Sequence, residues 1–235
     1  MPKLRVDIWS DIACPWCYVG KRRFEAALAR FPHRRDVEIV WRAFELDPSA
    51  PRARQGGAAY AERLAKKYGT PLAEAEGMIT RMTEVAAADG LAFHFERIRP
   101  GNTFDAHRLV HLALEHGVQD AMKERLLRAY MTEGEDLGDQ DVLLRLAGEA
   151  GLDQDEARAV LTRDSHAAAV RADEEEARAL GINGVPFFVF ANRIAVSGAQ
   201  PADLMLEALT QAWTTVSGPT VMGEEGAVCG PDGCA

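Results

Sequence analysis

The sequence contains no long hydrophobic run. No window approaches the roughly 20 consecutive apolar residues that a membrane-spanning helix needs, and the first residues, MPKLRVDIWSD, lack the apolar run of a secretory signal. We therefore expect a cytoplasmic protein that has no membrane partner. Cysteine is also scarce, with four among 235 residues. Because a reducing compartment disfavours structural disulfides, closely spaced cysteines are expected to be catalytic or metal-binding.

Positive charge is in deficit as well. Lysine and arginine number 27 against 36 acidic residues, which gives a net charge of −9. Nucleic acid, with its phosphate backbone, is therefore not an expected partner. No glycine-rich phosphate loop or nucleotide-binding fingerprint is present, so we expect no NAD, FAD or ATP cofactor. The apolar fraction of 47% and the length fit a globular protein of one large or two small domains.

The first fifty residues read as a strand, a helix and a second strand. Residues 4–9, LRVDIW, alternate apolar and polar and predict a strand. Phe24, Leu28 and Phe31 then recur on one helix face, and this helix is expected to end near Phe31, because Pro32 follows. Residues 37–46 predict the second strand.

The remainder of the chain predicts helices followed by a hairpin and a last helix. From about residue 58 to 180 the pattern is helical, interrupted by one short extended piece at 91–95. The run PFFVF and the segment IAVSG predict a hairpin, and a helix opens at Pro201. The expected fold class is therefore α/β, a thioredoxin-like fold with a large helical insertion. Its predicted parts are a discontinuous thioredoxin-like domain of residues 1–50 and 181–214, a helical insertion domain of 51–180, and a flexible cysteine-containing tail of 215–235.

Two of the four cysteines stand where the first strand gives way to the helix. Cys14 and Cys17 enclose Pro15 and Trp16, and Pro15 suits the first helical position. Unpaired N–H groups at a helix start stabilise a thiolate, which is the attacking species in disulfide exchange. We therefore expect Cys14 to be an exposed nucleophile of lowered pKa and Cys17 to be the resolving thiol. A zinc half-site, a structural disulfide and inert buried thiols are the alternatives.

A second motif supports the redox interpretation. In a thioredoxin fold, a proline just before the third strand packs against the cysteine pair through a cis peptide bond. Val185-Pro186, in GVPFFVF, stands at that position. The backbone of Val185 is then expected to pair with an extended substrate segment.

These motifs carry a family resemblance over about residues 4–213. CPWC after DIWSDIA, the helical insertion and GVPFFVF resemble the DsbA-like thiol–disulfide oxidoreductases, and among them the FrnE subgroup. The resemblance implies a thiol–disulfide oxidoreductase or isomerase acting on proteins with disulfides or thiols. It implies glutathione or a thioredoxin-type protein as candidate reductants. DsbA itself has a histidine in the intervening dipeptide where this chain has Trp16, so we expect a less acidic Cys14 and a less oxidising enzyme.

A second resemblance leaves an alternative function open. The segment NTFDAHRL, residues 102–109, is similar to a pattern of 2-hydroxychromene-2-carboxylate isomerases and kappa-class glutathione transferases, which implies that Asn102 and His107 line the cleft. The alternative is therefore a glutathione-dependent isomerase or transferase. Those relatives carry serine at the catalytic position, and Cys14 counts against a simple transfer of their activity. A metal-binding or chaperone-like protein is a third hypothesis.

The other two cysteines lie in the tail, in the sequence CGPDGCA. Its proline and glycines favour a turn that brings Cys229 and Cys234 together. The pair has three interpretations: a second redox pair that exchanges electrons with Cys14 and Cys17, a tetrathiolate metal site with them, or an incidental disulfide or free thiols.

Several polar residues are weaker candidates. His107, His111 and Glu115 share one helix face at a spacing that could ligate a metal, but satisfied or solvent-facing histidines are the commoner case, so we predict no metal site. The run of acidic residues at 173–176 predicts a solvated helix face. Asp11 flanks the cysteine pair, and if it is buried it is a candidate acceptor for the proton of Cys17.

Overall fold

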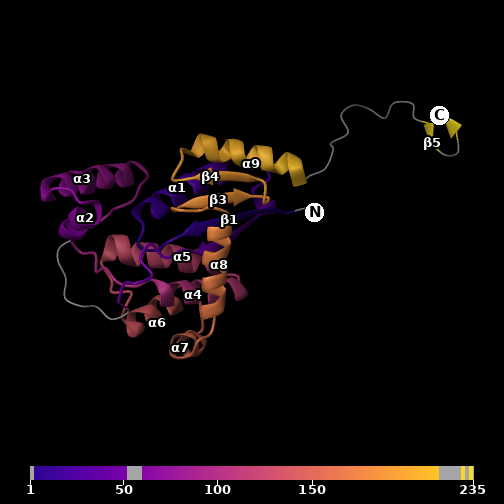
Figure 1. Ribbon diagram of the computed structural model, residues 1–235. Helices are drawn as coiled ribbons and strands as arrows, with labels where there is room; N and C mark the ends of the chain where they lie inside the picture. The colour runs from indigo at the N-terminus through magenta and orange to yellow at the C-terminus, as the bar shows by residue number, and fades with distance from the viewer. Residues whose placement is uncertain (1–2, 52–59, 217–228, 231–232, 235) are drawn as a thin grey trace.

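A four-stranded mixed sheet forms the centre of the molecule (Figure 1). The computed structural model describes residues 3–51, 60–216, 229–230 and 233–234. The strands are ordered β2-β1-β3-β4, with β1 parallel to β2, and β3 antiparallel to both of its neighbours. Their bounds are β1 Leu4–Ser10, β2 Val37–Ala43, β3 Phe187–Phe190 and β4 Ile194–Ser197. This arrangement confirms the predicted thioredoxin-like fold.

Helices cover both faces of this sheet (Figure 1). On one face, α1 packs against α9, and Phe24 of α1 contacts Phe188 and Phe190 of β3. On the other face, α4, α5 and α8 contact β2. The helices are α1 Pro15–Arg30, α2 Tyr60–Tyr68, α3 Leu72–Ala88, α4 Phe104–Glu115, α5 Gln119–Arg128, α6 Gln140–Glu149, α7 Gln154–Thr162, α8 Ala167–Ala179 and α9 Ala202–Val216, with a short 3₁₀ turn η1 Arg34–Asp36 and a π-helical turn η2 Ala129–Glu133. Within the described ranges, no helix has the length and apolar character of a membrane span.

The hydrophobic core is continuous across the predicted boundary between the thioredoxin-like part and the helical insertion. One cluster of buried apolar side chains runs from Leu4 and Ile8 of the sheet to Leu126 and Leu143 of the insertion. The division into residues 1–50 with 181–214 and residues 51–180 therefore stays a prediction about domains. What the packing shows is a continuous apolar interface between the two parts.

Residues 91–95, predicted to be a short extended interruption of the helices, are not helical and form an irregular segment. Leu91, Phe93 and Phe95 are buried in the core, and the His94 N–H bonds to the Met131 carbonyl, but no ladder forms. The alternation reflects core-facing side chains of an irregular segment, which the pattern alone does not distinguish from a strand.

The described part of the tail contains the predicted reversal. The two-residue strands β5 Cys229–Gly230 and β6 Gly233–Cys234 pair antiparallel, with Cys229 opposite Cys234. Residues 215 and 216 belong to α9. The prediction that the tail is flexible otherwise falls on residues 217–228, 231–232 and 235, which lie outside the described residues.

A close backbone approach ends the π-helical turn η2. Gly134 has φ of 72°, and a Cβ added there would lie 2.7 Å from the Arg97 carbonyl oxygen. Only glycine tolerates this combination of positive φ and contact. Gly134 therefore helps to fix the end of η2, the turn that contains Tyr130.

We expect Gly134→Ala to lower the free energy of unfolding by about 2–3 kcal/mol, from backbone strain together with the clash. Urea unfolding measures it. Gly117→Ala is the matched control, because Gly117 has φ of 70° but no atom within 4 Å of the added Cβ. It should lose only about 1 kcal/mol from strain. Equal losses in the two variants would show that the contact with Arg97 is unimportant.

Candidate active site

Cys14 and Cys17 lie at the start of α1, as the sequence predicts. Cys14 is the N-cap, Pro15 follows at the first helical position, and Cys17 is in the first turn. Both are free thiols. Cys17 is fully buried and Cys14 is only 4% exposed, so the expected exposed nucleophile is instead recessed. The Sγ of Cys14 donates a hydrogen bond to the carbonyl of Val185, 3.5 Å away.

The loop before β3 closes over the cysteine pair. The Val185-Pro186 peptide bond is cis. Helix α1 approaches this loop closely at Gly20, where an added Cβ would lie 2.8 Å from Cγ of Pro186. Segments 171 residues apart in the sequence thus meet at Cys14 and Val185.

The electrostatics of Cys14 differ from the expectation of an acidic thiol. The hydrogen bond with Cys17, burial, and the negative charges of Cys17 and Asp11 raise the pKa of the Cys14 thiol well above its ordinary value of 9.0. A helix N-terminus favours a thiolate by about 0.3–1 kcal/mol, up to ~2 kcal/mol when partly buried. The raised pKa of Cys14 shows that burial, Cys17 and Asp11 together outweigh this effect.

Asp11 is a buried acid next to the pair, only 1% exposed. Its carboxylate accepts a hydrogen bond from the Leu46 N–H at 2.8 Å and lies 3.3 Å from Nε2 of His107. Burial raises the pKa of Asp11, but the bonds from His107 and Leu46 outweigh it and leave the pKa lowered. Burial also lowers the pKa of His107. The Asp11 side chain is therefore ionised at neutral pH. Its lowered pKa makes it a weak acceptor for the proton of Cys17.

Sequence reasoning missed Lys123, a lysine of α5 with no exposed surface. Its Nζ donates to the Ser10 carbonyl at 3.0 Å, and it makes no ion pair with a carboxylate in the described part of the chain. Fully buried lysines are rare without such a partner. Burial lowers the pKa of Lys123 to about 8, while Cys17, Asp11 and Cys14 act in the opposite direction. The only feature of the sequence that could have indicated the burial of Lys123 is its position next to the apolar residue Met122.

A large cleft opens above Cys14, with a volume of about 1330 Å³. Cys14, Pro15, Trp16 and Val185 line one side, and Trp16 is 44% exposed. The opposite side is formed mainly by α2, α3 and the residues around them. The lining of the cleft includes Tyr60, Arg63, Lys66, Lys67, Met78, Ile79, Arg81, Met82, Phe95 and Tyr130.

Asn102 and His107 are not among the residues that line this cleft. The Asn102 amide donates to the Glu45 carboxylate at 3.1 Å and accepts from the Phe104 N–H, so its polar atoms are already used. His107 lies behind Asp11. The prediction that these two side chains face the cleft is thus corrected: they support it from behind.

The acidic run at residues 173–176 is not wholly solvated. Asp173 is 2% exposed, and its carboxylate accepts from the Ala43 N–H and from Arg42, each at 2.8 Å. His111 Nε2 lies 2.9 Å from the same carboxylate. His111 and His107 therefore face different acids, and no group of three His, Cys, Asp or Glu side chains forms a metal-binding arrangement within the described residues.

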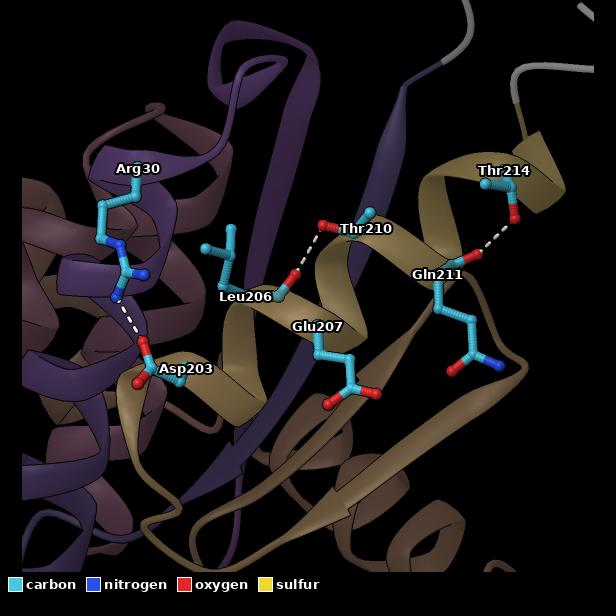
Figure 2. Close-up of a pocket in the computed structure, with 7 residues that line it drawn as sticks. All are labelled: Arg30, Asp203, Leu206, Glu207, Thr210, Gln211 and Thr214. Atoms are coloured by element: carbon cyan, nitrogen blue, oxygen red, sulfur yellow. Dashed lines mark hydrogen bonds and ion pairs between the residues drawn. The ribbon is translucent and has the colours of Figure 1, made fainter.

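Another depression, on the outer side of α1 and α9, shares no lining residue with the cleft (Figure 2). Arg30 and Asp203 form an ion pair there at 2.6 Å, and the hydroxyls of Thr210 and Thr214 bond to backbone carbonyls of α9. These groups are engaged within the protein, whereas the side chains of Glu207 and Gln211 bond to no described residue; none of the residues that line the depression is a cysteine, so the cleft at Cys14 is the candidate active site.

The fold and the site define a thioredoxin-like protein with a dithiol at a helix start. A family profile, the DSBA-like thioredoxin domain, matches residues 5–210. The chain therefore belongs to the DsbA-like family, and it is a thiol–disulfide oxidoreductase. Members of this family act on protein thiols and disulfides. The narrower FrnE assignment stays a prediction.

The chain is also similar to individual proteins. The structure of a probable DsbA oxidoreductase from Streptomyces coelicolor is 47% identical, with a TM-score of 0.85, and covers 99% of this chain and 98% of that chain. An uncharacterised protein of Bacillus subtilis (strain 168), YwbO, is 28% identical over 88% of this chain and 96% of its own length. The cytosolic disulfide reductase DsbM from Pseudomonas aeruginosa, solved with GSH, shares the fold at 20% identity, with a TM-score of 0.63 over 88% of this chain and 98% of that chain.

The raised pKa of Cys14 can be tested by its alkylation rate. We expect the rate with iodoacetamide in the reduced enzyme to rise with pH to a midpoint above 9, because the neutral thiol is unreactive. In Cys17→Ala the midpoint should fall, since the largest cause of the shift is removed. A wild-type midpoint below about 7 would instead mean that the helix N-terminus dominates.

Lys123 should contribute a pH-dependent change in stability. Between pH of about 8 and 10.5 the unfolded chain binds a proton at this lysine that the folded chain does not, so stability rises with pH. Relative to Lys123→Met, we expect the wild type to gain up to about 3 kcal/mol across this range in urea unfolding.

Lys21→Met is the matched control for Lys123. Lys21 is also buried, but Asp120 and Glu124 lie 3.2 and 3.1 Å from its Nζ. Burial lowers its pKa, yet these acids and Glu25 outweigh burial and raise it above 10.5. The wild type should therefore show no such gain relative to Lys21→Met. Identical pH slopes for the two variants would contradict a lowered pKa at Lys123.

Proposed function

We propose that the protein is a cytoplasmic disulfide reductase or isomerase whose active site is Cys14-Pro15-Trp16-Cys17. The observation that carries the proposal is the contact of Cys14 with the Val185 carbonyl at the mouth of the cleft. An extended substrate segment beside Val185 and Pro186 would present its disulfide to Cys14.

The reaction follows from the positions of the two thiols. The Cys14 thiolate attacks one sulfur of a substrate disulfide, forms a mixed disulfide and expels the other sulfur as a thiolate, which takes up a proton. Cys17 then loses its proton and attacks the Cys14 sulfur, which releases the second substrate thiol and leaves a Cys14–Cys17 disulfide. Two electrons pass from the enzyme dithiol to the substrate.

The direction of reduction is supported by the electrostatics of Cys14. A strongly oxidising dithiol needs a stabilised thiolate in its reduced form. Here burial, Cys17 and Asp11 disfavour that thiolate, and Trp16 carries no positive charge to offset them. The enzyme must then be re-reduced, and we propose glutathione or a thioredoxin-type protein for this step. The cytosolic reductase DsbM, which shares the fold, was solved with GSH.

We also propose that the tail takes part in electron transfer. The register that sets Cys229 opposite Cys234 supports a second pair able to form a disulfide. A tethered pair exchanges at a high effective concentration. Electrons would then pass from a Cys229–Cys234 dithiol to the Cys14–Cys17 disulfide, which regenerates the active thiols.

Reduction of insulin by dithiothreitol tests the proposal. We expect the wild type to accelerate insulin precipitation and Cys14→Ser to fall to the uncatalysed rate, because serine cannot form the mixed disulfide. Cys229→Ser/Cys234→Ser should retain the reaction with dithiothreitol, which reduces the active pair directly, but turn over more slowly with a protein reductant. If wild type and Cys14→Ser match the uncatalysed rate, the enzyme does not exchange thiols with proteins.

The alternative, a glutathione-dependent isomerase or transferase acting on a small aromatic molecule, has less support. Catalysis of that kind does not require a second thiol, whereas Cys17 lies one turn from Cys14. Glutathione binding without disulfide exchange would favour it.

A further inference from the structure

The cleft wall that faces Cys14 carries positive charges that no carboxylate of the described residues pairs with, although Nζ of Lys67 lies 5.9 Å from the centroid of the Tyr68 ring. Arg63, Lys66 and Lys67 on α2 and Arg81 on α3 all line the cleft and are exposed. None of the four forms an ion pair with a carboxylate of the described residues, although Arg145, for example, pairs with two. In a chain of net charge −9, this is an unusual concentration of uncompensated cations beside the reactive thiol.

Three acids line the same cleft, and none of them forms an ion pair with these cations. Asp11 is bonded to His107 and Leu46, and Asp47 accepts both the N–H and the hydroxyl of Ser49. Glu62, on α2, is the remaining acid of the lining, and it makes no ion pair with a described residue. The four cations of the lining outnumber its three acids, and Asp11 and Asp47 are bonded to other groups, so the wall formed by α2 and α3 favours a negatively charged segment.

The floor of the cleft has a second polar feature. Tyr130 is 3% exposed and lines the cleft, yet its hydroxyl has no hydrogen-bond partner among the described residues. The same holds for the half-buried Tyr60. Burial raises the pKa of Tyr60 to about 12 and raises that of Tyr130 as well, so both hydroxyls are donors at neutral pH. A π-helical turn, a distortion common at functional sites, places Tyr130 there.

The size and composition of the cleft favour a polypeptide over a small molecule. Its volume of about 1330 Å³ exceeds the usual range of small-ligand pockets, about 300–1,000 Å³. Met78, Ile79, Met82 and Phe95 supply apolar surface within it. Val185, at its mouth, offers backbone groups to an extended chain.

We propose that the cleft selects protein disulfides whose cysteine is flanked by acidic residues. Arg63, Lys66 and Arg81 would hold flanking carboxylates at the rim, and the Tyr130 hydroxyl would donate to a flanking carboxylate at the floor. The inference rests on the proposed function and names the substrate class of the same site.

Two peptides that differ only in charge test the selection. Each has one cysteine linked to neutral 2-thiopyridine, with apolar residues and either glutamate or glutamine on both sides of the cysteine. The absorbance of released pyridine-2-thione gives the second-order rate constant with reduced enzyme. The readout is the ratio of the glutamate to the glutamine rate, which a general loss of activity does not change.

For the wild type we expect a ratio of about ten at low ionic strength, from two or three charge contacts and one hydrogen bond. The ratio should fall towards about two in high salt. Arg63→Gln/Lys66→Gln should lower it to about two, and Tyr130→Phe should lower it severalfold. Arg34→Gln/Arg35→Gln removes the same charge from η1, outside the cleft, and should keep the wild-type ratio.

The outcomes separate this inference from the proposed function. If the wild type uses both peptides equally through Cys14, or if the Arg34/Arg35 control loses as much as the cleft variant, acidic selection is wrong and thiol exchange stands. If neither peptide reacts faster with the wild type than with Cys14→Ser, the proposed function fails and this inference fails with it.

Discussion

Buried polar bonds between the helical insertion and the ends of β1 and β2 hold the active site in place. Lys123 of α5 reaches the Ser10 carbonyl, His107 of α4 reaches Asp11, and Asp173 of α8 accepts from the Ala43 N–H. Each would cost about 1–3 kcal/mol if it were left unpaired. The turn that carries Cys14 therefore cannot shift relative to the insertion without breaking several of them together.

The buried polar groups around the active site also determine the reactivity of Cys14 and Cys17. A cysteine at a helix start invites the expectation of an acidic thiol, but in this protein the site is dry and Asp11 brings a negative charge to it. The buried ammonium of Lys123 acts against these effects, since thiolates at Cys14 and Cys17 would raise its pKa. Ionisation of the thiols and of the lysine is thus linked, and the insertion contributes directly to the reactivity of the pair.

The sheet, α1, the cis proline and the position of the cysteine pair could be predicted from the sequence, because each depends on neighbouring residues or on a short motif. Charge burial could not be predicted in this way. Asp173 lies in a run that looks solvated, and Lys123 follows an apolar helix position, yet both are buried because distant backbone groups bond to them. The segment at 91–95 interrupts the helices as the sequence predicts, and its buried side chains join the core rather than a sheet.

Different elements supply the reactive thiols and the surface proposed to recognise the substrate. The sheet and α1 supply Cys14, Cys17 and the Val185-Pro186 loop, while α2 and α3 supply the opposite wall of the cleft. Helix α3 makes only limited contact with α1, and α2 packs mainly on α3. Met82 and Ala86 of α3 belong to the main core, but the exposed side chains of α2 and α3 line the cleft, so this surface can differ among relatives while the dithiol stays fixed. Substrate choice in this fold is therefore free to change by substitutions on α2 and α3, without any change in the bonds that set the reactivity of Cys14.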